Sequence, residues 1–128
     1  MKKTIINILV LFSVSIFTGC SYKNTDLVQI KPNLKNLTKR ANSAIERRGI
    51  TIEKMDLFLK NKYPILMENF KDYDLKYNYK NGVTVVLLCE DNQAVYEDLS
   101  CDVKIDKDYS GKNLECDFQI KQPKCIEE

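Results

Sequence analysis

The stretch YDLKYNYKNGVTVVLLC, residues 73–89, decides the fold. Its first seven residues alternate between apolar and polar, which is typical of a β-strand with one covered face. Residues 83–89 are apolar on both faces, as expected of a central strand that is covered on two sides. Between them stands Asn81-Gly82, a dipeptide that favours a two-residue hairpin turn. The stretch therefore predicts two antiparallel strands.

The turn also predicts the register of this hairpin. Folding about it produces the pairs Tyr79 with Thr84, Tyr77 with Val86 and Leu75 with Leu88. These side chains share one face with a third tyrosine, Tyr73. A tyrosine stripe of this kind usually forms sheet core, and the alternative is a surface that binds a sugar or a peptide.

Two amphipathic helices are predicted before the hairpin. The first covers residues 34–48, ends at Gly49, and carries one apolar stripe, formed by Leu34, Leu37, Ala41, Ala44 and Ile45. The second begins after Thr51, a suitable N-cap, and ends before Pro64. Its apolar face consists of Ile52, Met55, Phe58 and Leu59. A further short helical turn is expected over residues 65–70, with Pro64 at its first position.

More strands are expected after the hairpin. Residues 90–93 indicate a turn, and residues 94–98 a strand or a helical turn. Apolar residues alternate again over residues 99–105 and 114–120, on either side of a charged loop. Symmetrical folding of that loop predicts three cross-strand pairs, Leu99 with Phe118, Cys101 with Cys116 and Val103 with Leu114. The predicted fold class is α+β, with two N-terminal helices packed on a small three- or four-stranded antiparallel sheet.

The N-terminus has the features of an export signal. Two lysines precede an apolar run of about 13 residues, which is short of the roughly 20 that a membrane-spanning helix needs. The sequence Phe17-Thr18-Gly19-Cys20 at its end resembles the lipobox of bacterial lipoproteins, although Phe17 stands where Leu is usual. An ordinary signal peptide with a chance cysteine, or an uncleaved anchor, is the alternative.

The lipoprotein resemblance implies a processed and acylated chain. The signal peptide, residues 1–19, is expected to be removed, after which Cys20 carries a diacylglyceryl thioether and an acyl chain such as palmitate. Residues 20–33 are then the lipidated cysteine and a tether, and residues 34–128 a single α+β domain. Ser21 after the cysteine favours the outer membrane in enterobacterial lipoproteins, so the expected place is the cell envelope, with the domain facing the periplasm.

Four cysteines remain in the mature chain, Cys89, Cys101, Cys116 and Cys125. An even number in a small exported domain favours two disulfide bonds. Their spacing lacks the C-x-x-C pairs of a zinc site. Three pairings are possible, and two of them are preferred. The first joins Cys89 to Cys101 and Cys116 to Cys125; the second joins Cys101 to Cys116 and Cys89 to Cys125.

Charge is divided between the two halves of the mature chain. Residues 21–62 hold ten basic and four acidic residues, whereas residues 63–128 hold eight and fourteen. The basic half could favour anionic headgroups, although solvated helix faces attracted to the acidic half are the plainer explanation. The halves cancel, so nucleic acid is not an expected partner.

Few residues suggest chemistry. The chain has no histidine, which removes the commonest general base and metal ligand. Asp102, Asp106 and Asp108 lack the glycine and distal glutamate of a calcium loop, so a solvated loop is predicted. The adjacent carboxylates of residues 90–91 and 97–98 are expected in surface turns. We therefore expect no cofactor, no metal and no catalysis.

A second resemblance concerns the helices. Gly49-Ile50-Thr51, Met55 and Pro64, followed by strands, look like a motif of small outer-membrane assembly lipoproteins of the BamE type, over about 16 residues. The glycine before that family's proline is absent here, where Lys62-Tyr63 stands.

The function expected from the sequence is that of a lipid-anchored binding or structural module with an envelope protein as partner. The alternatives are an accessory of outer-membrane protein assembly, and an inhibitor or immunity lipoprotein that plugs a hydrolase or toxin with the loop Lys104–Lys112.

Overall fold

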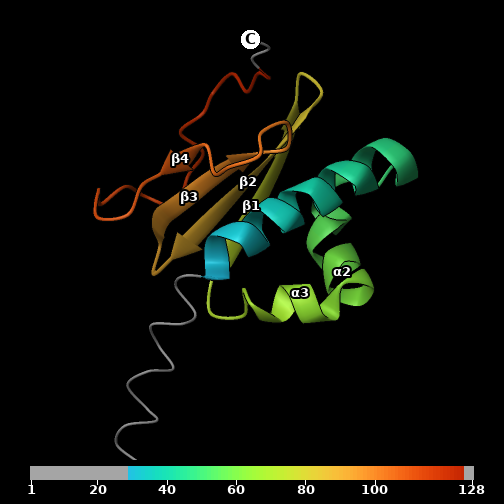
Figure 1. Cartoon of the computed structure of the whole chain (residues 1–128), viewed down its shortest axis with the longest axis horizontal. Helices are drawn as coiled ribbons and strands as arrows, with labels where there is room; N and C mark the ends of the chain where they lie inside the picture. Colours follow the sequence, from blue (N-terminus) through green and yellow to red (C-terminus); the bar gives the residue numbers. More distant parts are fainter. Residues whose placement is uncertain (1–28, 126–128) are drawn as a thin grey trace, which may run out of the picture. The chain divides into compact units, whose positions relative to one another are not determined.

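The computed structural model describes residues 29–125 (Figure 1). The expected signal peptide, Cys20 and residues 21–28 of the expected tether lie outside the described residues. Helices and a four-stranded antiparallel sheet, with the strands in the order β1-β2-β3-β4, confirm the α+β fold class.

The central hairpin forms with the predicted register. Strands β1 (Asp74–Lys80) and β2 (Val83–Glu90) pair antiparallel, and Tyr77 lies opposite Val86. Asn81 and Gly82 have φ angles of 56° and 76°, the left-handed values that a two-residue hairpin turn of this kind requires. Every residue of β2 before its last is buried, so this strand is covered on both faces.

The third strand, β3 (Gln93–Leu99), pairs with β2, which confirms the strand prediction for residues 94–98. The turn before it again has two residues with positive φ, Asp91 at 51° and Asn92 at 66°. Strand β4 (Lys107–Asp108) is a two-residue pairing with β3 at the sheet edge.

From residue 29 onward, three helical segments precede the sheet. The long helix covers residues 29–48 and α2 covers Ile52–Lys62, followed by the short α3 (Pro64–Glu68). The stripe Leu34, Leu37, Ala41 and Ala44 is 0–2% exposed. Gly49, at φ 67°, ends the long helix as predicted, with its N–H on the Ile45 carbonyl at 3.1 Å. The long helix differs from the prediction at its start, because residues 29–33, expected in the tether, are helical in spite of Pro32.

The strand pairing predicted between residues 99–105 and 114–120 is wrong. Neither segment forms a strand of the sheet. Residues 109–125, here called the C-terminal strap, instead cross the sheet face opposite the long helix, where their apolar side chains pack on β2 and its neighbours. The packing side chains are those of Leu114, Cys116, Phe118 and Ile120. Their alternation therefore reports contact with an apolar face, and the pairing of the strap with the sheet is an isolated antiparallel bridge between Glu115 and Gln93 of β3.

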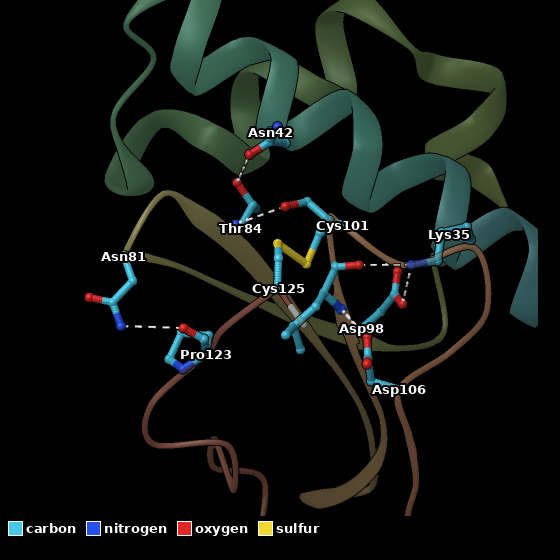
Figure 2. Close-up of a disulfide and its surroundings, with 11 residues drawn as sticks. Lys35, Asn42, Asn81, Thr84, Asp98, Cys101, Asp106, Pro123 and Cys125 are labelled. Carbon is cyan, nitrogen blue, oxygen red and sulfur yellow. Dashed lines mark hydrogen bonds and ion pairs between the residues drawn. A yellow bond between two sulfur atoms is a disulfide. The ribbon is translucent and has the colours of Figure 1, made fainter. Parts of the chain in front are cut away.

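The disulfide bonds join Cys89 to Cys116 and Cys101 to Cys125, so the two pairings preferred from the sequence are wrong; Figure 2 shows the Cys101–Cys125 bond. The antiparallel register explains why. Because Val85 lies opposite Leu99, Cys101 lies beyond one end of β2 while Cys89 lies near the other. Cys116 is held at the Cys89 end, where its N–H donates to the Asn92 carbonyl at 2.9 Å.

Peptide mapping of the unreduced protein tests this connectivity. Trypsin alone leaves Cys89 and Cys101 in one peptide, because no lysine or arginine lies between them, so a second cut after glutamate is needed. The structure predicts linked peptides that carry Cys89–Cys116 and Cys101–Cys125. A linked peptide that contains Cys89 and Cys125 would contradict it.

Replacement of either cystine by two alanines should lower the free energy of unfolding by about 3 kcal/mol.

Candidate functional site

The carboxylates of Glu97 and Asp98 are fully buried, contrary to the expectation that this pair lies in a surface turn. Successive side chains of a strand point to opposite faces. Asp98 therefore faces the long helix, whereas Glu97 faces the C-terminal strap. The two carboxylates are separated by the sheet and do not form an acid–base pair.

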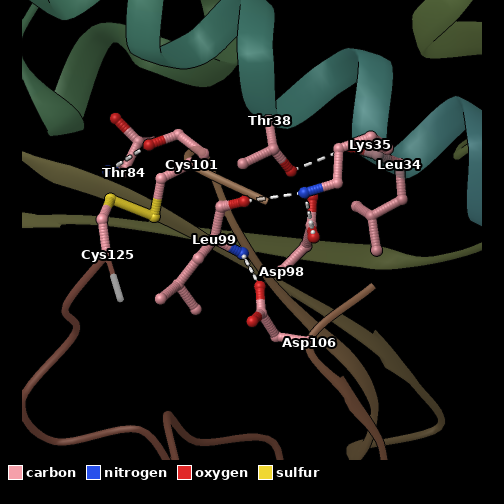
Figure 3. A network of polar contacts seen from close by, with 10 residues as sticks. Leu34, Lys35, Thr38, Thr84, Asp98, Leu99, Cys101, Asp106 and Cys125 are labelled. Carbon is pink, nitrogen blue, oxygen red and sulfur yellow. Dashed lines mark hydrogen bonds and ion pairs between the residues drawn. A yellow bond between two sulfur atoms is a disulfide. The ribbon is translucent and has the colours of Figure 1, made fainter. Parts of the chain in front are cut away.

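Asp98 forms a buried ion pair with Lys35 of the long helix (Figure 3). The Lys35 ammonium lies 2.7 Å from Oδ1 and also donates to the Leu99 carbonyl at 2.7 Å. Apart from this ion pair, neither Asp98 oxygen has a hydrogen-bond partner among the described residues. Burial raises the pKa of the Asp98 carboxyl above its usual range even though Lys35 lowers it. This pair fixes the long helix to β3 at one point.

Glu97 holds the C-terminal strap. Its Oε1 accepts hydrogen bonds from the Tyr109 hydroxyl at 2.8 Å and from the Gln119 N–H at 3.0 Å, and its Oε2 accepts from the Ile120 N–H at 3.1 Å. Burial and the Glu97 carboxylate raise the pKa of Tyr109, which keeps the phenol as donor. Both buried carboxylates thus serve the scaffold.

The three aspartates of the charged loop have different partners. Asp106 accepts from the Leu99 N–H at 2.9 Å, and its pKa is raised to about 7 by burial and by the neighbouring Asp102. Asp108 is exposed and pairs with Lys31 at 3.3 Å, and its pKa is lowered chiefly by the Ser110 hydroxyl. Across residues 29–125 no group of three or more histidine, cysteine or acidic side chains is placed to hold a metal ion.

The predicted tyrosine stripe does not behave as one surface. Tyr77 is buried and donates to Asp56 of α2 at 3.2 Å, and burial raises its pKa. Tyr79 is 37% exposed. Tyr73 is half-buried and lines a cleft beside β1. The prediction of sheet core is therefore confirmed for Tyr77, whereas Tyr73 faces the cleft beside β1.

The cleft beside β1 has a volume of about 720 Å³. Its lining combines apolar side chains with charges of both signs and includes Asp56, Lys60, Met67, Phe70, Tyr73 and Lys76. Lys60 and Asp56 pair across one helical turn at 2.8 Å, and Lys76 donates to the Cys116 carbonyl at 2.8 Å. Such a lining suits an amphipathic protein segment.

A second exposed feature is the loop that follows Cys101. The Cys101–Cys125 disulfide and β4 hold its two ends, and its tip presents Val103 with 88% of its surface exposed. Within the predicted plug Lys104–Lys112, Tyr109 is buried, whereas residues 110–112 after it are exposed.

No protein-family model matches the chain, and neither curated proteins nor solved structures show a significant match. Within the described part of the chain, none of the helices has the length and apolar character needed to cross a bilayer.

The Lys35–Asp98 pair generates a prediction for stability. Lys35→Met should lower the free energy of unfolding by about 3 kcal/mol, because a buried carboxylate loses its partner. Adding Asp98→Asn should restore at least about 1 kcal/mol, because no charge then remains buried. Urea unfolding at neutral pH with the disulfides intact measures both values.

The matched control is Lys39→Met, an exposed lysine of the same helix, which should change stability by less than about 0.5 kcal/mol. If the double variant lost as much unfolding free energy as the sum of the Lys35→Met and Asp98→Asn losses, the two side chains would not interact.

Proposed function

We propose that the mature chain is a lipid-anchored envelope protein that binds a protein partner and does not catalyse a reaction. Its place would be the outer membrane, with the domain facing the periplasm and Cys20 as the acylated anchor. Support comes from the lipobox-like sequence and from two disulfide bonds in a small domain, which are typical of exported proteins.

The main support for the binding role is that the C-terminal strap is held in one conformation on the sheet. Two disulfides and the Glu97 carboxylate fasten this irregular segment to the sheet. The cleft beside β1 is bordered by it at Cys116 and by α3 on the other side. A surface held in one conformation loses little entropy on binding, which is what a binding module requires.

An inhibitor role is the second candidate. The observation that favours it is the exposed Val103 at the tip of a loop fixed at both ends. The BamE-type resemblance supports the accessory role in outer-membrane assembly, for which the cleft would be the partner surface.

Site-specific photo-crosslinking in intact cells tests these alternatives. One photoreactive residue replaces Asp74, which is exposed in the cleft, another replaces Val103, and a control replaces the exposed Lys112 of the strap. The proposal predicts a crosslink to a resident envelope protein from the Asp74 position. Crosslinks from Val103 alone to a foreign hydrolase or toxin would favour the inhibitor role.

Cys20→Ala in the same cells tests the anchor. The variant should persist as an unacylated precursor that retains residues 1–19, and the Asp74 crosslink should weaken because the domain is not delivered. A Cys20→Ala protein of normal mature mass in the membrane fraction would contradict the lipoprotein assignment.

A further inference from the structure

A basic groove lies where the long helix passes the joint between α2 and α3. It has a volume of about 300 Å³ and is lined by Asn36 and Arg40 of the long helix and by residues 62–66 of the joint. The Arg40 guanidinium lies 5.0 Å from the centre of the Tyr63 ring, which places the joint directly beside the long helix.

Two cations of this groove have no acidic partner. No carboxylate of the described residues forms an ion pair with Arg40 or Lys62, and the groove lining contains no aspartate or glutamate. Arg40 donates only to the Asn36 side chain, at 3.3 Å, so most of its donors remain available. The groove is therefore a site of positive potential that is open to an anion.

An exposed apolar side chain lies beside these cations. Ile65, one residue after Pro64 at the start of α3, has 86% of its surface exposed, and Leu66 lines the groove next to it. An exposed aliphatic side chain next to lysine and arginine is the arrangement found where proteins meet a bilayer, because the aliphatic group enters the acyl boundary while the cations stay among the headgroups.

We propose that this groove binds the headgroup of an anionic phospholipid in the membrane to which Cys20 is anchored. Arg40 and Lys62 would contact the phosphate, and Ile65 would enter the acyl boundary. The inference rests on the proposed anchoring. The chain permits the contact, since the nine residues from Cys20 to residue 29 span at most about 30 Å. A free phosphate would account for the two cations but not for Ile65.

The test measures how fast a water-soluble acylating reagent modifies Lys62 in the full-length lipidated protein, reconstituted in vesicles. Vesicles that contain phosphatidylglycerol are compared with vesicles of phosphatidylcholine alone, and Lys112 and Lys124 serve as internal references. Modification of Lys62 should be about five-fold slower in the anionic vesicles, because the lysine is engaged by headgroups. The reference lysines should react at equal rates in both.

Arg40→Gln should abolish most of this difference, whereas the matched variant Lys112→Gln should leave it unchanged. Equal Lys62 modification in both vesicles, with the protein bound to both, would overturn the inference and leave the anchor intact. Failure of the protein to float with either vesicle would overturn the anchor and the inference together. Protection of Lys62 in native membranes but not in anionic vesicles would also overturn it, and would indicate an acidic protein partner.

Discussion

The structure depends on β2, whose seven residues from Val83 to Cys89 are all buried. A strand that is apolar on both faces must be covered on both, and within residues 29–125 the helices cover one of them. The C-terminal strap covers the other face, and Figure 1 shows it on the side of the sheet away from the long helix. The need for two covering layers thus determines what the C-terminal strap must do.

An irregular segment lacks the regular backbone hydrogen bonds of a helix or strand, so other contacts must hold it on the sheet. The strap has few backbone pairs with the sheet, such as that from the Ala94 N–H to the Leu114 carbonyl at 2.9 Å. The Glu97 carboxylate and the two disulfides also hold the strap in place. In addition, the Asn81 side chain donates to the Pro123 carbonyl at 3.3 Å (Figure 2). The buried carboxylates are therefore used to hold layers together.

Local patterns predicted the hairpin, its register, α2 and the buried β2, because turn chemistry and side-chain alternation act between neighbours in the sequence. They did not predict contacts between residues that lie far apart in the sequence. Alternation over residues 114–120 marked an apolar face correctly but not the element that it meets. Glu97-Asp98 resembled a surface turn, and the partner of Asp98 lies 63 residues earlier. The one available signal was a polar row, Lys35, Thr38 and Asn42, beside the apolar stripe of the long helix.

The central claim is that the strap is a fixed structural layer and not a loose tail. Amide hydrogen exchange at Gln119 and Ile120, the two N–H groups bound by Glu97, tests it most directly, because neither belongs to a strand. We expect protection comparable to that of the β2 amides, lost at both positions in Glu97→Leu, whose side chain has no acceptor, relative to the wild-type protein. Exchange at the rate of an unstructured peptide in the wild-type protein, with the disulfides intact, would contradict it.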